Sequence, residues 1–297
     1  MRWFLGVLNV WVFDKDSLMS GVLKTWAEQM GVNVHQAVIA NRNFSDQFLS
    51  EFKVLGESID YIVLILGQDV DESSWLSQEW LEALKVFSHR QNIPIIIQSS
   101  AAVFTGESSY LFTELDTPVP SSAYGKYCLS VEHLFLDHER SMVLRTGWLY
   151  SEHPLGWLMG LMRDVENGNP IDFPADQFVQ PTSCHDFARV LVAIMEQLTC
   201  CDDPLLWSTY HYASADQVSK NRFCQFIMNE MGIYIDVSAS TLESTPFQGR
   251  QVSDFLSQYS VIDCTKVLST FGIKQRAWKK EITSLITSRF SEVERKS

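Results

Sequence analysis

The sequence of 297 residues has no stretch that approaches the ~18 consecutive apolar residues of a membrane-spanning helix. Positive charge is scarce as well, because 23 Lys and Arg stand against 36 Asp and Glu, a formal net charge of −13. This balance argues against nucleic acid and anionic membrane surfaces as partners, since both are bound by clustered Lys and Arg. The apolar run at 3–13 is followed directly by Asp14-Lys15-Asp16, and we expect a buried strand there rather than a signal peptide.

The six cysteines include no Cys-x-x-Cys pair and no nearby His set at zinc spacing. This usage is typical of reduced thiols in a cytoplasmic protein, and it predicts no metal site. Hydrophobic content of 46% and charged content of 20% are ordinary for a globular chain. The 18 Phe and 9 Trp are enough to build a large core.

Apolar strands alternate with amphipathic helices in the first half of the chain. The segment 61–66 is wholly apolar, as strands buried on both faces are, while 17–30 repeats apolar residues at helical spacing. Such alternation predicts an α/β fold with a Rossmann-like, doubly wound parallel sheet. Strands are expected within 2–13 and at 33–39, 61–66, 93–98, 142–145 and 210–213, with helices at 17–30, 44–55, 75–89 and 124–138.

Beyond about residue 150 the alternation loosens, and a smaller C-terminal α/β substrate lobe is expected. Helices are predicted at 155–166, 184–198 and 220–231, with a last one starting near 279. Ligands of open α/β sheets bind at the carboxyl ends of the strands, where this lobe would stand. We therefore expect a dinucleotide-binding-type domain at 1–150, with 183–213 packing on it, and a substrate-binding-type lobe at 151–182 and 214–297.

The most informative motif places Tyr124 at the start of a helix, after a proline-rich loop, with Ser100 at the end of the preceding strand. This is the layout of a Ser-Tyr-Lys reductase site. That chemistry needs a Lys one helical turn after the Tyr, on the same face. Cys128 stands at this position, and Lys126 points about 200° away because it is only two residues further along the helix.

Five segments in chain order carry a family resemblance. Residues 99–106 are similar to Ser-Thr-Asp-Tyr-Val-Phe-x-Gly, 144–150 to Leu-Arg-Thr-Ser-Trp-Val-Tyr, and 176–182 to Asp-Gln-x-Gly-x-Pro-Thr, while 210–213 and 262–266 match later landmarks. Together they resemble the extended short-chain dehydrogenase/reductase superfamily, and within it the dTDP-4-dehydrorhamnose reductase family. Members typically use NADPH or NADH to reduce a 4-keto sugar attached to a nucleotide, and some relatives act instead as regulatory partner proteins.

The resemblance implies a role for each candidate site residue. Tyr124 would donate the proton, Ser100 would hydrogen-bond to the carbonyl oxygen, and Cys128 replaces the Lys that contacts the cofactor ribose and lowers the Tyr pKa from ~10. Ala101 and Ala102 replace a polar Asp and Tyr of the family. By the same resemblance a homodimer is expected by analogy, and the residues near the nucleotide-sugar site would be Arg145, Trp148 and Gln177. Trp148 has two readings, a base-stacking ring or inter-lobe core.

The phosphate-binding loop departs from the family. Residues 14–20 align with Gly-x-x-Gly-x-x-Gly but contain no glycine, so side chains would crowd the phosphates. Asp14 and Asp16 add carboxylates where the pyrophosphate would lie, and each repulsion is worth roughly 1 to 4 kcal/mol. The remaining candidate contacts to NADP or NAD are Ser17, in this loop, and Arg42, which lies where a side chain would contact the adenosine ribose. A solvated loop Arg is the alternative for Arg42.

Two main functions stay open at this point. We favour a non-catalytic relative that binds a nucleotide, a nucleotide sugar or a protein partner, because folding needs neither the missing Lys nor the missing glycines. The alternative is an active NAD(P)H-dependent nucleotide-sugar 4-keto reductase with an atypical site that uses Tyr124 and Ser100. A third reading makes Cys128 a thiol nucleophile, but nothing basic nearby in the sequence would activate it.

Overall fold

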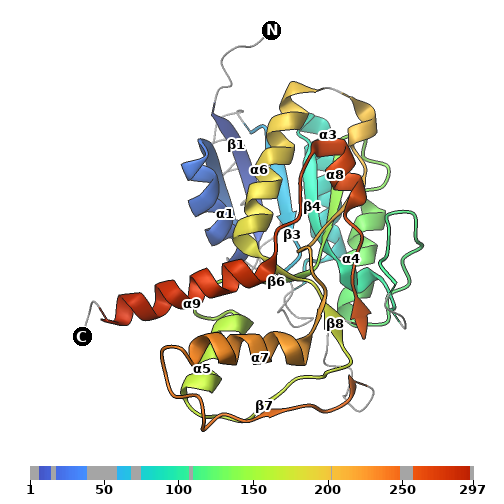
Figure 1. Cartoon of the computed structure of the whole chain (residues 1–297). Coiled ribbons are helices and arrows are strands. Elements are labelled where there is room, and N and C mark those ends of the chain that lie inside the picture. The colour runs from blue at the N-terminus through green and yellow to red at the C-terminus, as the bar shows by residue number, and fades with distance from the viewer. Residues whose placement is uncertain are drawn as a thin grey trace.

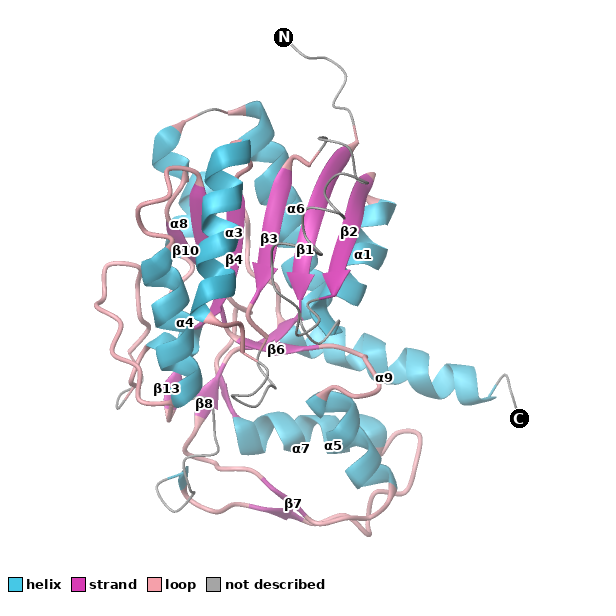
Figure 2. Cartoon of the chain, turned by 180° about the vertical axis from the view of Figure 1, so that it is seen from behind, coloured by secondary structure: helices cyan, strands magenta, loops and turns pink. Residues whose placement is uncertain are grey.

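A parallel sheet forms the larger body of the molecule (Figure 2). The computed structural model describes residues 7–14, 18–38, 59–67, 75–106, 110–201, 203–247 and 257–294. Six of the strands in these residues pair in the order β10-β5-β4-β3-β1-β2, with every pair parallel. They are β1 (Leu8–Asp14), β2 (Val32–Val38), β3 (Tyr61–Ile65), β4 (Ile95–Ser100), β5 (Ser141–Thr146) and β10 (Thr209–Tyr212).

Helices cover both faces of the sheet. Figure 1 shows α1 and α6 on the near face, and Figure 2, from behind, shows α3 and α4 on the other. Their bounds are α1 (Leu18–Gln29), α3 (Gln78–Gln91), α4 (Ala123–Leu134) and α6 (Cys184–Cys200). This arrangement confirms the predicted doubly wound α/β fold. Every residue of β3 and β4 is buried, as the apolar runs in the sequence indicated.

The observed elements lie close to their predicted places. Helix α3 begins at Gln78 rather than near 75, because the hydroxyl of Ser77 accepts a hydrogen bond from the Trp80 N–H and caps the helix there. Helix α4 ends at Leu134 rather than at 138, since the chain must turn before β5. The predicted helix at 44–55 lies outside the described residues.

The smaller lobe stands at the carboxyl ends of the strands, where the arrowheads of β1, β2 and β3 point in Figure 2. Its helices are α5 (Trp157–Glu166), α7 (Lys220–Met231) and α9 (Trp278–Glu294). Its short strands pair as β8 with β11 and β13, and as β7 with β12. Their bounds are β7 (Ile171–Asp172), β8 (Phe178–Val179), β11 (Val218–Ser219), β12 (Leu242–Glu243) and β13 (Tyr259–Ser260).

Two features of how the lobes are built were not expected from the sequence. Strands β6 (Trp148–Tyr150) and β9 (Pro181–Ser183) pair in parallel and form the neck between them. Gly147 allows this neck, because a Cβ at that position would lie 2.4 Å from the carbonyl oxygen of Gln180. Helix α8 (Thr265–Phe271), within the segment expected in the smaller lobe, packs instead beside β10 of the large sheet.

None of the helices in the described residues combines the length and the apolar character that crossing a membrane requires. All six cysteines are free thiols, and four of them are buried.

Candidate functional site

Tyr124 is held in the first turn of α4 by two local features. The Ser122 hydroxyl caps the helix by accepting a hydrogen bond from the N–H of Gly125 at 3.0 Å. Gly125 lets the helix approach the turn after β4, because a Cβ there would lie 2.1 Å from the carbonyl oxygen of Ala102. The close approach brings Tyr124 beside Ser100, and the two side chains interact. The structure therefore joins the Tyr and Ser that the sequence singled out.

The Tyr124 hydroxyl is buried and already engaged. The residue is 4% exposed, and its hydroxyl donates a hydrogen bond to the carbonyl oxygen of Gly67, just beyond β3. Burial raises the Tyr124 pKa well above its usual value of 10, and Cys128 raises it further. Proton donation in a Ser-Tyr-Lys site needs the opposite shift, since the Lys charge there lowers the pKa of the phenol.

Ser100 is fully buried at the end of β4. Its hydroxyl oxygen accepts a hydrogen bond from the N–H of Ala102 at 3.2 Å and so caps the short 3₁₀ turn Ala101–Val103. The contact with Tyr124 slightly favours the ionised phenol, but burial is the larger effect on that pKa. Ser100 therefore has a structural role in this turn, whatever it does for a ligand.

Cys128 supplies neither a positive charge nor a thiolate. The residue is fully buried, and burial raises the pKa of its thiol to about 12. The thiol is therefore neutral near pH 7, and the reading of Cys128 as an activated nucleophile loses its physical basis. Lys126 is exposed while Tyr124 and Cys128 are buried, as expected for a side chain on the opposite face of α4.

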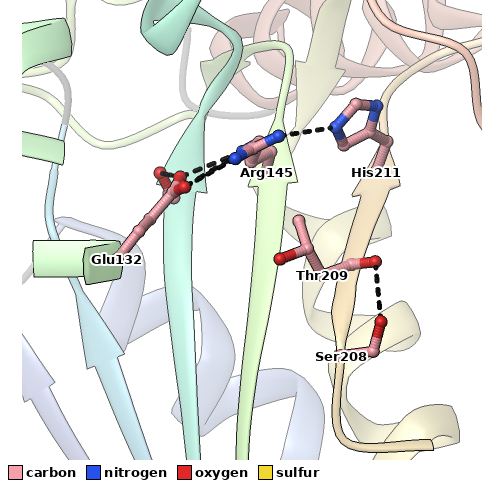
Figure 3. Close-up of polar contacts among 6 residues, drawn as sticks. Glu132, Arg145, Ser208, Thr209 and His211 are labelled. Atoms are coloured by element: carbon pink, nitrogen blue, oxygen red, sulfur yellow. Dashed lines mark hydrogen bonds and ion pairs between the residues drawn. The ribbon is translucent and has the colours of Figure 1, made fainter. Parts of the chain in front are cut away.

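A buried ion pair joins Glu132 of α4 to Arg145 of β5 (Figure 3). Glu132 follows Cys128 by one helical turn, and its carboxylate receives the Arg145 guanidinium in a bidentate contact, with Nη2–Oε2 at 2.7 Å and Nε–Oε1 at 3.0 Å. Ser99 donates a further hydrogen bond to the same carboxylate. The side chains of Glu132 and Arg145 are only 4% and 6% exposed, so each charge depends on the other.

His211 extends this network on the far side of Arg145 (Figure 3). Its Nδ1 lies 3.2 Å from the carbonyl oxygen of Phe112, so this nitrogen must carry the hydrogen, and Nε2 accepts from Arg145 Nη1 at 3.4 Å. Burial and the adjacent Arg145 lower the His211 pKa to about 3. The imidazole is consequently neutral, and it fixes the guanidinium in place.

Arg145, expected near the nucleotide-sugar site, is therefore part of the interior. It is 5% exposed, its guanidinium contacts Glu132 and His211, and its Cζ lies 5.1 Å above the ring of Phe104. Direct contact with a ligand would require these contacts to open. Its place in a substrate site stays a prediction.

Trp148 has both faces of its ring covered. The ring stacks on Trp157 with centroids 3.7 Å apart and planes 7° from parallel, and Lys220 Nζ lies 5.0 Å over it. Because Trp157 fills one face, the ammonium must lie over the other. The residue is 4% exposed, so in this conformation no face of the indole is free to stack on a base. The contacts are those of inter-lobe core.

Gln177 is also fully buried. Its side-chain amide donates to the carbonyl of Ser257 at 3.4 Å, and its backbone carbonyl accepts from the N–H of Lys220 at 2.9 Å. Lys220 thus links the neighbourhoods of Gln177 and Trp148, whereas Arg145 lies in the separate network around Glu132. The three residues predicted for substrate are not gathered on one surface.

The cofactor edge is described only in part, since Ser17 and Arg42 lie outside the described residues. Asp14 is the last residue of β1, beside Val38 of β2 and Ile65 of β3. The strand order reverses at β1, which is where dinucleotides bind in doubly wound sheets. A pyrophosphate at such an edge needs backbone N–H donors, and Asp14 brings a carboxylate that is 5% exposed. Asp14 is therefore the residue described at the end of β1, and its carboxylate disfavours a pyrophosphate there.

Glu132, His211 and Gly67 were missed by the sequence reasoning. Glu132 could have been found, because Tyr124, Cys128 and Glu132 follow one another at four-residue intervals and so share one helix face. Neither the carbonyl of Gly67 nor the pairing of His211 with Arg145 leaves a local signal, since each contact joins segments far apart in the chain.

Comparison with known protein families shows which family this chain belongs to. A family described as RmlD substrate binding domain matches residues 70–290. The chain belongs to this family. The matched region of the RmlD substrate binding domain family begins after β3, so the strands and loops of the cofactor edge at β1 and β2 precede it.

Individual relatives agree with this membership. The chain is 28% identical over 203 residues to a dTDP-4-dehydrorhamnose reductase of Aggregatibacter actinomycetemcomitans. The aligned region covers 66% of this chain and 67% of the relative. Its fold matches that of a dTDP-4-dehydrorhamnose reductase from Bacillus anthracis in complex with NADP, with a TM-score of 0.77, 16% identity and 96% and 98% of the two chains covered. The corresponding protein of Clostridium acetobutylicum gives a TM-score of 0.76, 18% identity and 97% and 100% coverage. The resemblance seen in the motifs is confirmed.

Proposed function

We propose that this chain is a non-catalytic member of its family, which keeps the reductase fold as a binding or regulatory module for a nucleotide sugar or a protein partner. The observation that carries the proposal is the state of Tyr124. Its hydroxyl is buried against the Gly67 carbonyl, and the position of the activating Lys holds a neutral thiol.

The proton-transfer chemistry of the family argues for this reading. Reduction of a ketone leaves an alkoxide that must receive a proton, and general acids work best with a pKa near the operating pH. Burial and Cys128 move the Tyr124 pKa in the opposite direction. A proton donor that is both less acidic and already bound to a carbonyl contributes little to catalysis.

The cofactor side supports the same proposal. The related protein from Bacillus anthracis was solved with NADP, and the family resemblance implies such a cofactor. In this chain the described end of β1 carries the buried carboxylate of Asp14, which would disfavour a pyrophosphate there. We infer that a nicotinamide dinucleotide is not a working cofactor here.

An active reductase remains the second candidate because Ser100 and Tyr124 meet as they must in that chemistry. A turnover assay separates the two. With NADPH or NADH and dTDP-4-dehydrorhamnose, we expect no loss of absorbance at the nicotinamide band beyond that seen with Tyr124→Phe, which lacks the phenolic proton. Turnover by the natural chain that Tyr124→Phe abolishes would establish the reductase instead.

A further inference from the structure

A cleft of about 1060 Å³ lies between α9 and the neck of the molecule, where β6 and β9 meet the start of α6. Figure 1 shows α9 running outward from this neck, below α1 and α6. The volume is at the upper end of the range for small-molecule sites, about 300 to 1,000 Å³. None of the residues of the Tyr124 site lines this cleft, so it is a separate feature.

Cationic side chains converge on the cleft although the chain as a whole is strongly acidic. Arg276, Lys280 and Arg289 come from α9 and the segment before it, and His185 comes from the first turn of α6. The lining carboxylates are Glu152 and Glu281. Three permanent cations therefore line this cleft beside two carboxylates, in a protein of net charge −13.

The carboxylates in the lining are already engaged by neighbouring groups. Glu152 lies 2.7 Å from His185 Nε2, and Glu281 interacts with the hydroxyl of Ser183. Arg289 is held by Glu166 outside the cleft, at 2.9 Å. Within the described part of the chain, no carboxylate forms an ion pair with Lys280.

Two further donors lie in the same wall. Arg276 is half exposed, and its Nε is 3.4 Å from the Asp186 carboxylate, which is long for a charge-assisted hydrogen bond. Tyr150 is 3% exposed, and its hydroxyl lies near Ser183 but has no hydrogen bond of normal geometry to a described residue. Both groups can donate hydrogen bonds, which suits a ligand rich in acceptors.

The apolar part of the lining indicates an organic body beside the anion. Met159 of α5 and Leu285 of α9 contribute to the wall. We propose that this cleft binds a small phosphate ester, such as a sugar phosphate, with its phosphate on Lys280 and Arg276 and its organic part between Met159 and Leu285. The site is independent of the function proposed for the Tyr124 region.

Calorimetric titration of the full chain at low ionic strength tests the site with three probes: glucose 1-phosphate, inorganic phosphate and glucose. We expect glucose 1-phosphate to bind, phosphate to compete with it, and glucose alone to give no heat. Lys280→Ala should weaken binding at least about tenfold, which corresponds to the loss of one charge-assisted contact of ~1.4 kcal/mol.

Lys279→Ala is the matched control, because Lys279 is exposed on α9 as Lys280 is, but it does not line the cleft and lies near the Trp278 ring. This variant should bind glucose 1-phosphate within about twofold of the natural chain, less than the change from one lost contact. Arg276→Ala should weaken binding as Lys280→Ala does. The proposal fails if glucose 1-phosphate gives no heat, or if Lys279→Ala and Lys280→Ala weaken binding equally.

Discussion

At the scale of single residues, one side chain changes the chemistry of the site. A Lys at position 128 would place a cation beside Tyr124, whereas the observed thiol is neutral and raises the pKa of the phenol. The hydroxyl instead donates to the Gly67 carbonyl, which anchors α4 to the end of β3. In this conformation the Tyr124 hydroxyl is a hydrogen-bond donor to the backbone.

Restoring the lysine alone should not restore a reductase. In Cys128→Lys the ammonium would stand one helical turn before Glu132, where it competes with Arg145 for the carboxylate. We expect no NADPH oxidation with dTDP-4-dehydrorhamnose from this variant, and none unless residues 14–20 are also made glycine-rich. Circular dichroism checks that the variant is folded, and turnover by Cys128→Lys alone would show that the cofactor edge is intact.

At the scale of elements, α4, β5 and β10 are tied together by the buried chain Glu132–Arg145–His211. Removing one charge leaves the other unpaired in the interior, which costs about 3 to 5 kcal/mol. Glu132→Gln should therefore lower the free energy of unfolding by that amount in urea denaturation. Glu139→Gln, an exposed change near the end of the same segment, should leave it unchanged.

The double variant Glu132→Leu/Arg145→Met sharpens this test. Both charges are then absent, so no unpaired ion is left behind, and the loss should be smaller than in Glu132→Gln alone. A Glu132→Gln variant whose free energy of unfolding lies within about 1 kcal/mol of that of the natural chain would contradict the role given to the pair. A hydrogen bond between neutral groups makes a net contribution of only about that size.

His211 makes the same elements sensitive to acid. Its pKa is about 3 in the folded chain and near 6.5 in the unfolded chain, so between these values only the unfolded state takes up the proton. The stability from neutral His211 is complete above pH ~6.5 and is lost as the pH falls toward 3. In His211→Gln the fall of unfolding free energy from pH 6.5 to 4 should be shallower, and an unchanged slope would contradict the assignment.

The sequence predicted the long helices and strands well, but it did not predict most of the side-chain contacts of the site. Apolar runs predicted β3 and β4, and the four-residue spacing of Tyr124 and Cys128 predicted their shared face. The short strands β6 and β9 were missed because three residues carry too little periodicity. The burial of Arg145 was missed because its partner His211 lies on another strand, and such pairing leaves no local pattern.

At the scale of the whole molecule, the described residues keep the fold of the solved relatives, with TM-scores of 0.76 and 0.77. The family match begins only after β3, and the described end of β1 offers Asp14 in place of a glycine. The lobes are joined by the β6–β9 neck and by the Trp148–Trp157 stack, which buries the indole of Trp148 that was predicted near a substrate.

Binding of NADPH to the full natural chain is the most direct test of the central claim. A ligand that binds only the folded state contributes about 2.7 kcal/mol at a concentration of 100 Kd, which raises the melting temperature by several degrees. We predict that millimolar NADPH or NADH leaves the melting temperature unchanged. A rise of several degrees would show that the dinucleotide binds, and it would contradict the non-catalytic account.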